Sequence, residues 1–230
     1  MAGSTFQTNP FDLFKLLDDC HCGVLQLPDF QRSWVWDEDR IKSLIASVSR
    51  TFPVGALMSL DTGGPGNFKP WPIEGAPPGA KQITPQSLLL DGQQRMTLLY
   101  QVTLRNQIVE TMTPKNKKVK RWFYIDIRKA LDPFIEREEA IIGVPEDRVI
   151  RKEFAREIVL DLSSPEEEYE LLMFPVTQVF DWDRWQDGFN EHWRGDQHED
   201  VRQEFRMFKR NVLENFEYYV PVISLDRSTF

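Results

Sequence analysis

The chain has 230 residues, of which 41% are apolar and 12% aromatic, so it can bury a sizeable hydrophobic core. Its formal net charge of −8 argues against a protein whose main task is to coat nucleic acid, because phosphate neutralisation supplies most non-specific affinity. No apolar run approaches the roughly 20 residues of a membrane-spanning helix, and the polar N-terminus lacks a signal-peptide pattern. We therefore expect no membrane partner and a cytoplasmic location, which the two closely spaced cysteines also fit.

Turn residues and helical spacing predict the first elements. Asn9-Pro10 is a typical helix start and Gly23 a typical stop, which predicts a short amphipathic helix between them. Residues 24–28 form a predicted strand, and a second helix begins at Asp37. The apolar positions expected on the inner faces of these helices are Phe11, Phe14, Leu17, Ile41, Leu44, Ile45 and Val48.

The middle of the chain predicts two further strands and a helix. Residues 54–60 form one candidate strand, and residues 87–90 form the other. The segment between them, 61–86, is rich in Gly and Pro and predicts a long surface loop. A helix is expected from about residue 94 to 106, with an inner side made by Met96, Leu99, Val102 and Thr103.

The second half of the chain is predicted to be mainly helical scaffold. A strand over 122–127 is followed by an acidic helix start at 165–168, a long amphipathic helix through 201–216 and a last strand at 218–225. We predict an α+β fold in which residues 1–127 form a mixed-sheet core and residues 128–230 a helical extension ending in a strand. Because the chain stops soon after that strand, we expect it to be part of a longer protein.

Five basic residues precede the strand at 122–127, namely Lys115, Lys117, Lys118, Lys120 and Arg121. We interpret this stretch as a solvated turn, with a local contact to nucleic acid as the alternative.

The most informative motif is Asp91-Gly92-Gln93-Gln94-Arg95, between a predicted strand and a predicted helix. At such a junction free N–H groups and the positive end of the helix dipole can bind an anion. Gly92 lets the backbone approach, the two glutamines add amide donors, and Arg95 matches phosphate oxygens. Asp91 would repel phosphate unless it holds a cation, orients water or caps the helix. The motif predicts a phosphate site, with a simple turn and cap as the alternative.

A second cluster, Phe30-Gln31-Arg32-Ser33-Trp34-Val35-Trp36, places an arginine and an amide among three aromatic side chains. Arg32 can contact a phosphate while an aromatic ring stacks on a base. The alternative is that the aromatic residues anchor the core and that Arg32 only lies along it.

Taken together, these motifs resemble a known family. Phe30-Gln31-Arg32 with Trp36, then Phe52-Pro53-Val54-Gly55, then the run from Leu90 to Leu98 are similar in order and spacing to the N-terminal domain of GmrSD-type modification-dependent restriction endonucleases. The resemblance is strongest over residues 24–104. It implies a ParB/sulfiredoxin-like fold and a domain that binds and hydrolyses nucleotides, joined in the whole protein to an HNH nuclease domain.

By position, the resemblance implies that Gln31, Arg32, Gly92 and Arg95 bind a nucleoside triphosphate, GTP or another. Catalysis is assigned to Asp91, Gln93, Gln94 and Arg95, with Mg2+ held through Asp91. Modified DNA is the expected partner of the full-length protein, in restriction and anti-phage defence. The alternatives are a sensor that binds nucleotide or modified DNA without hydrolysis, and a purely structural domain.

Other chemistry is less well supported by the residue spacing. An HNH site needs histidines that bind metal and activate water, and His21, His192 and His198 show no such arrangement, so we expect no DNA cleavage by this chain. Cys20-His21-Cys22 lacks the second ligand pair of a structural zinc site. The stretch 181–185 is interpreted as a helix start with two packing tryptophans instead of a metal site.

Overall fold

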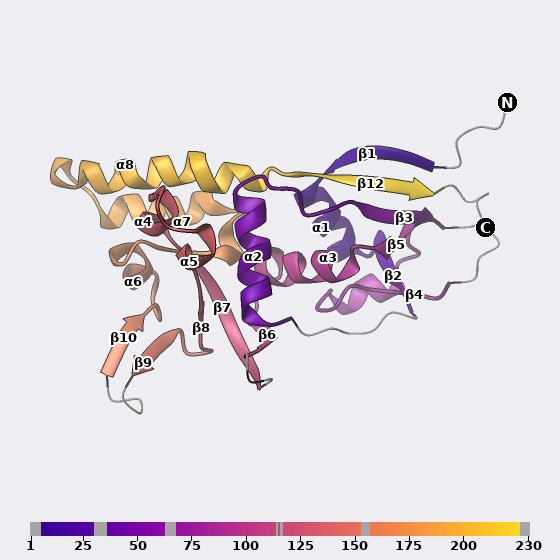
Figure 1. The fold of residues 1–230 in the computed structure, drawn as a ribbon, viewed down its shortest axis with the longest axis horizontal. Helices are drawn as coiled ribbons and strands as arrows, with labels where there is room; N and C mark the ends of the chain where they lie inside the picture. The colour runs from indigo at the N-terminus through magenta and orange to yellow at the C-terminus, as the bar shows by residue number, and fades with distance from the viewer. Residues whose placement is uncertain are drawn as a thin grey trace. The chain divides into compact units, whose positions relative to one another are not determined.

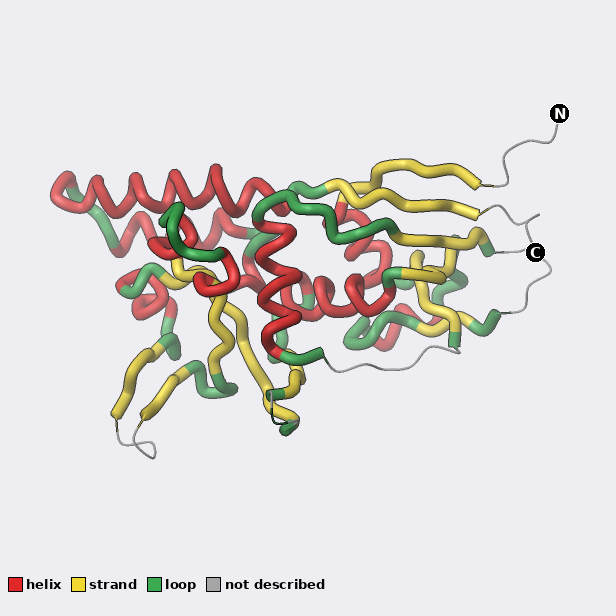
Figure 2. The backbone as a smooth tube through the Cα atoms, in the orientation of Figure 1, coloured by secondary structure: helices red, strands yellow, loops and turns green. Residues whose placement is uncertain are grey.

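The computed structural model describes residues 6–29, 36–62, 68–113, 115, 117–152 and 157–225. It has a mixed α+β fold, as predicted, with helices and strands in both parts of the chain (Figure 2). Its contacts divide the chain into two compact units, unit 1 with Met1–Trp34, Pro53–Gln101 and Glu217–Phe230, and unit 2 with Val35–Phe52 and Val102–Phe216. The units interleave along the sequence, which differs from the linear division at residue 127 that the sequence suggested.

Unit 1 is built on a six-stranded mixed sheet with the order β1-β12-β3-β5-β2-β4 (Figure 1). Pairs β12–β3 and β2–β5 are parallel, and the other neighbours are antiparallel. The strands are β1 (Phe6–Asp12), β2 (Leu25–Pro28), β3 (Leu57–Asp61), β4 (Pro70–Trp71), β5 (Ser87–Asp91) and β12 (Tyr219–Leu225). The helices of this unit are α1 (Leu13–Cys22) and α3 (Gln93–Leu99), the latter continued by a π-helical turn, Tyr100–Leu104.

The predicted helix start at Asn9-Pro10 is wrong, because these residues belong to edge strand β1. Pro10 lies opposite Pro221 of β12. Neither proline has an N–H to donate, so the two can face each other only at a position where the strands exchange no hydrogen bond. Helix α1 begins after Asp12 instead, whose side chain accepts a hydrogen bond from the Lys15 N–H at 2.8 Å.

The later start also changes the buried face of α1. Its buried residues are Leu13, Leu16, Leu17 and Cys20. Of the three predicted positions, Leu17 is buried, whereas Phe11 and Phe14 are 39% and 43% exposed. The expected helix end is confirmed, since Gly23 follows α1 in the left-handed conformation with φ of 80°.

The predicted loop 61–86 carries more structure than its composition indicated. It contains β4 and a 3-10 turn, Pro78–Gln82, with Ile73 and Ala80 buried. The buried Gln26 amide fixes this segment by donating to the carbonyls of Gly23, Ala80 and Ile83 at 2.9, 3.1 and 3.0 Å. The bonds to Ala80 and Ile83 span 54 and 57 positions of the sequence, so local composition could not indicate them.

Unit 2 combines helices with short antiparallel strands. Strand β7 pairs with β6, β8 and β11, and β9 pairs with β10. The strands are β6 (Val109–Met112), β7 (Lys118–Asp126), β8 (Ile141–Val144), β9 (Val149–Lys152), β10 (Glu157–Asp161) and β11 (Met173–Pro175). The helices are α2 (Glu38–Ser49), α4 (Ile127–Leu131), α5 (Arg137–Ala140), α6 (Pro165–Glu170), α7 (Trp182–His192) and α8 (Glu199–Phe208).

Several predictions for this unit are confirmed. Helix α2 follows the Asp37 cap and buries Ile41, Leu44, Ile45 and Val48. In the core under α7 and α8, the Trp185 ring lies 5.0 Å from Phe174 and 5.2 Å from Phe205, measured between ring centroids. The interpretation of 115–121 as a turn needs correction, since Lys118, Lys120 and Arg121 belong to β7 and pair with β6.

A buried carboxylate, Glu168 on α6, was not predicted. It is 3% exposed and accepts hydrogen bonds from the Tyr124 hydroxyl at 2.9 Å and the Trp185 Nε1 at 3.0 Å. The Arg148 Nη1 lies 3.6 Å from its Oε1. Burial nevertheless dominates and raises the pKa of the Glu168 carboxyl above 4.5.

We predict that Glu168→Gln changes how stability depends on pH. A raised pKa means that the folded protein binds this proton more tightly than the unfolded chain, so the stabilising contribution is full below pH 4.5 and is lost as pH rises through the folded pKa. Glutamine does not titrate. Between pH 4.5 and the folded-state pKa, the free energy of unfolding of the variant should therefore rise relative to wild type, by up to about 1.4 kcal/mol per pH unit.

Urea denaturation from below pH 4.5 to neutrality measures this difference. Glu139→Gln, at an exposed position of α5 in the same unit, is the matched control. Parallel pH profiles of Glu168→Gln and wild type would contradict the prediction.

Candidate functional site

The motif 91–95 lies where strand β5 ends and helix α3 begins, as the sequence predicted. Gly92 makes the turn with φ of 84°, in the left-handed region. A Cβ at this position would overlap the Leu57 Cδ2 on neighbouring strand β3. Both the backbone conformation and the close approach of β3 therefore require glycine.

The first turn of α3 has no side-chain cap. Gly92 is its N-cap residue and has no side chain to accept the first N–H groups. Side chains cap helices α1, α2, α4 and α6, through Asp12, Asp37, Asp126 and Ser164, whereas α5, α7 and α8 begin like α3 without a side-chain cap. The N–H groups at this end of α3 lie beside the exposed Asp91 and Gln94. This arrangement can receive an anion.

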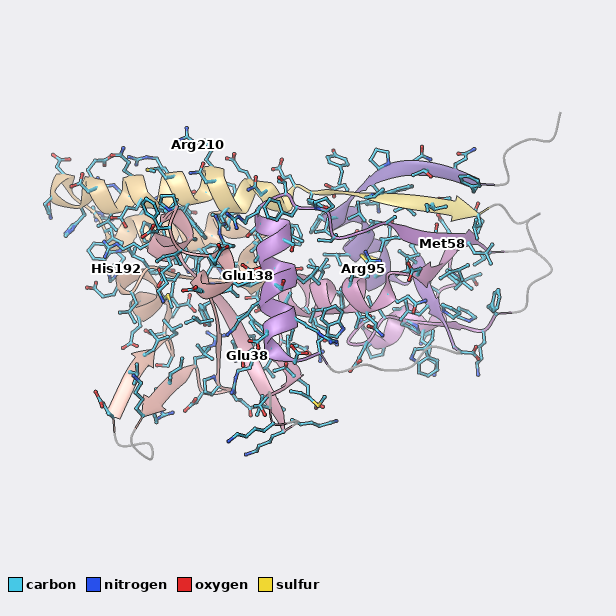
Figure 3. All side chains as sticks on the ribbon, in the orientation of Figure 1. Glu38, Met58, Arg95, Glu138, His192 and Arg210 are labelled. Atoms are coloured by element: carbon cyan, nitrogen blue, oxygen red, sulfur yellow. The ribbon has the colours of Figure 1, made fainter. Side chains whose placement is uncertain are left out.

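Arg95 binds the loop that precedes β3 (Figure 3). Its Nη1 donates a hydrogen bond to the Val54 carbonyl, and its Nη2 donates to the Ala56 carbonyl at 2.9 Å. The guanidinium passes so close to Gly55 that a Cβ there would overlap Nη1, and Gly55 has φ of 87°. The Asp91 carboxylate completes the contact, with its Oδ2 3.8 Å from Nη2. Arg95 thus joins the motif to residues about forty positions earlier.

Tyr218, the residue before β12, supports the same loop. Its hydroxyl accepts a hydrogen bond from the Val54 N–H at 3.2 Å. Val54 is therefore held through both its N–H and its carbonyl. The loop 53–56 is positioned by groups from α3 and from the C-terminal part of the chain.

The predicted site residues differ in where their side chains lie. Asp91 is exposed, with 73% of its side chain accessible, and Gln94 is also exposed. Arg95 is largely covered, with 24% accessible. Gln93 turns away from the motif and donates to the Leu89 carbonyl of β5. Gln31 and Arg32 lie outside the described residues.

Four residues of this arrangement were not predicted as site residues, namely Val54, Gly55, Ala56 and Tyr218. A signal existed for the loop, because Phe52-Pro53-Val54-Gly55 was one of the segments that carried the family resemblance. Its glycine indicates a position that needs a left-handed backbone or a close neighbour. Tyr218 gave no such signal, since a tyrosine at a strand start is also typical of the core.

The Cys20-His21-Cys22 segment has structural contacts in unit 1. The His21 Nδ1 lies 2.8 Å from the Tyr100 hydroxyl. Burial raises the pKa of the Cys20 thiol to about 12, so this thiol stays protonated at neutral pH. Cys22 is exposed, and its thiol lies 3.8 Å from the Asp18 carboxylate.

The described part of the chain contains neither a membrane-spanning helix nor a cluster of metal ligands. None of its helices has both the length and the apolar composition needed to cross a membrane. Within the same residues, no group of three or more His, Cys, Asp or Glu side chains is placed to hold a metal ion.

The fold and the site define an α+β domain with a glycine turn and an arginine clamp at a strand-to-helix junction. Residues 13–229 match the family described as GmrSD restriction endonuclease, N-terminal domain, and the chain belongs to this family. It is also 32% identical over 131 residues to the uncharacterized protein MJ0686 of Methanocaldococcus jannaschii. That match covers 54% of this chain and 22% of the archaeal protein, so the chain spans about a fifth of its relative's length.

We predict that Gly92→Ala destabilises the domain strongly. The substitution forces an L side chain into the left-handed region and against Leu57, which together should lower the free energy of unfolding by about 2–5 kcal/mol. Gly79→Ala is the matched control, because its added Cβ meets no atom within 4 Å. That variant should stay within about 0.5 kcal/mol of wild type in urea denaturation. Equal stability of the two variants would contradict the role assigned to Gly92.

Proposed function

We propose that the 91–95 junction binds the phosphates of a nucleoside triphosphate and hydrolyses it, GTP or another. The observation that supports this most is the side-chain-uncapped start of α3 at Gly92, with Asp91 and Gln94 exposed beside Arg95. Membership of the GmrSD N-terminal family supports a role in DNA restriction and anti-phage defence.

The residues of the junction would share the work of phosphoryl transfer. The main demands are positioning and neutralisation of charge on the phosphoryl oxygens. The N–H groups of α3 and the Arg95 guanidinium would supply the positive charge, and an arginine has more N–H donors than the two that bind Val54 and Ala56. Gln94 is the glutamine whose exposed amide can orient a water molecule. Gln93 is held by the Leu89 carbonyl and would act mainly by fixing the turn.

Asp91 is the residue that would hold Mg2+. Magnesium usually takes one or two protein carboxylates together with phosphate oxygens and water, and an exposed carboxylate next to a phosphate site fits that ligand set. When bound, the ion would neutralise charge on the phosphates. Asp91 would also balance the charge of Arg95 in the absence of nucleotide.

A second candidate function is a sensor that binds nucleotide, or the backbone of modified DNA, without turnover. The contacts that favour it are those of Gln93 and Arg95, because both side chains are engaged by backbone carbonyls. A site with fewer mobile polar groups is better suited to binding than to orienting water. Gln31 and Arg32 remain proposed members of the pocket in either case.

In the full-length protein, nucleotide hydrolysis would regulate a C-terminal HNH nuclease domain that acts on modified DNA. Since that target is inside the cell, we propose a cytoplasmic location. This chain by itself would not cut DNA.

We predict that Asp91→Asn lowers phosphate release by roughly 100-fold, because the Mg2+ that Asp91 would hold neutralises charge that develops on the phosphoryl oxygens. The assay uses each of the four ribonucleoside triphosphates with and without Mg2+. Asp61→Asn is the matched control, since Asp61 is an exposed carboxylate at the other end of the same β3–β5 pair and should have no effect. Gln94→Ala should lower turnover without changing stability, because the side chain is exposed.

Arg95→Ala is a less selective test, because it also removes the contacts to Val54 and Ala56. Its stability must therefore be measured beside its activity. Nucleotide binding without phosphate release in the wild-type chain would favour the sensor. If the wild-type chain neither binds nucleotide nor releases phosphate, both candidate functions are contradicted.

A further inference from the structure

A basic two-stranded ribbon in unit 2 has no part in the proposed nucleotide site. Strands β6 and β7 pair from Val109↔Arg121 to Met112↔Lys118. Between Val109 and Arg121 the chain has five cationic side chains and one carboxylate, although the whole chain has a formal net charge of −8. The ribbon is thus a local concentration of positive charge in an acidic protein.

The two faces of the ribbon differ. Val109 and Thr111 are buried, and Arg121 on the same face binds Glu38 of α2 at 3.3 Å (Figure 3). Successive residues of a strand point to opposite faces, so Lys118 and Lys120 lie on the other face. Their side chains are 67% and 52% accessible. This outer face and the exposed turn residues Lys115 and Lys117 form one basic surface, which we call the lysine ribbon.

The outer face continues along β7 to Trp122. The Arg148 guanidinium stacks over the Trp122 ring, 4.6 Å from its centroid. Arg148 is also close to the buried Glu168, which fixes its position. A partly exposed cation thus lies next to the lysine ribbon, beside an aromatic ring.

Two carboxylates lie on the lysine ribbon. The Glu110 Oε1 is 2.8 Å from the Lys118 Nζ, and the Glu146 Oε1 is 3.4 Å from the Lys120 Nζ. Exposed ion pairs of this kind contribute little to stability. They keep the lysine side chains extended over the surface, and a polyanion can compete for them.

We propose that the lysine ribbon binds the phosphate backbone of duplex DNA. The inference rests on the proposed restriction role and adds to it the surface through which this domain meets its target. A two-stranded β-ribbon has a width that the major groove of B-DNA admits, and lysines at its tip would then lie near the phosphates on both sides of the groove. Backbone contacts of this kind set the position on DNA and do not read its sequence.

The test measures binding of this chain to a short fluorescein-labelled duplex DNA by anisotropy across a salt series, without nucleotide. A variant with Lys117→Gln, Lys118→Gln and Lys120→Gln should bind roughly 10- to 100-fold more weakly at low salt, with a slope of log K against log salt that is smaller by about 2–3. The control variant carries Lys15→Gln, Lys69→Gln and Lys129→Gln. It removes the same charge from exposed positions elsewhere and should bind like wild type.

Glu110→Gln gives a change in the opposite direction. Removing this carboxylate takes away a competitor of the phosphates for Lys118, so binding should become several-fold tighter. A ribbon with only a structural role would not respond in this way. Urea denaturation of each variant shows whether the fold is intact.

Three results would overturn the proposal: no binding of duplex DNA by the wild-type chain, equal weakening by the two triple variants, or tighter lysine-dependent binding of single-stranded than of duplex DNA. Phosphate release measured on the same samples separates this proposal from the nucleotide site. If the triple variant of the lysine ribbon loses DNA binding and its nucleotide turnover is unchanged, the result supports the proposal that the lysine ribbon binds DNA. Lysine-dependent DNA binding in a chain that neither binds nor hydrolyses nucleotides would support the ribbon and contradict the nucleotide site.

Discussion

The contact between the Arg95 guanidinium and the carbonyls of Val54 and Ala56 is the interaction on which the site depends. It fixes the loop before β3 against the start of α3, and both glycines that allow it, Gly55 and Gly92, have positive φ. A charged donor to a backbone carbonyl is stronger than a neutral one, and its partial burial limits competition by water. The junction is therefore built before any ligand arrives.

This clamp changes how the motif is understood. From the sequence, Gln93, Gln94 and Arg95 were all expected to offer donors to a phosphate, and Gly92 to let the backbone approach it. In the fold these residues have different roles. Gly92 and Gln93 form the turn, and Arg95 binds the neighbouring loop before β3. Asp91 and Gln94 are the exposed members and are available for chemistry. The phosphoryl transfer that we propose would require preorganisation of this kind.

In unit 2, a buried carboxylate is held by hydrogen bonds and an ion pair. Glu168 lies among aromatic residues, and its oxygens are satisfied by Tyr124, Trp185 and Arg148. Such a group adds little net stability but makes the surrounding packing specific, because any rearrangement leaves a buried donor or acceptor unpaired. The same Arg148 stacks on Trp122 next to the lysine ribbon. One arginine therefore contacts both the buried Glu168 and the ring beside the exposed lysines.

The sequence by itself determined the local conformations: the strand, turn and helix around Gly92, the Asp37 cap of α2 and the apolar faces of α2 and α8. These depend on φ preferences, caps and periodicity, which act between near neighbours. Tertiary structure alone decided that Pro10 belongs to an edge strand, that Glu168 is buried and that Arg95 binds Val54. Each of these outcomes depends on a partner far away in the sequence and on the loss of water around the pair, and no local pattern records either.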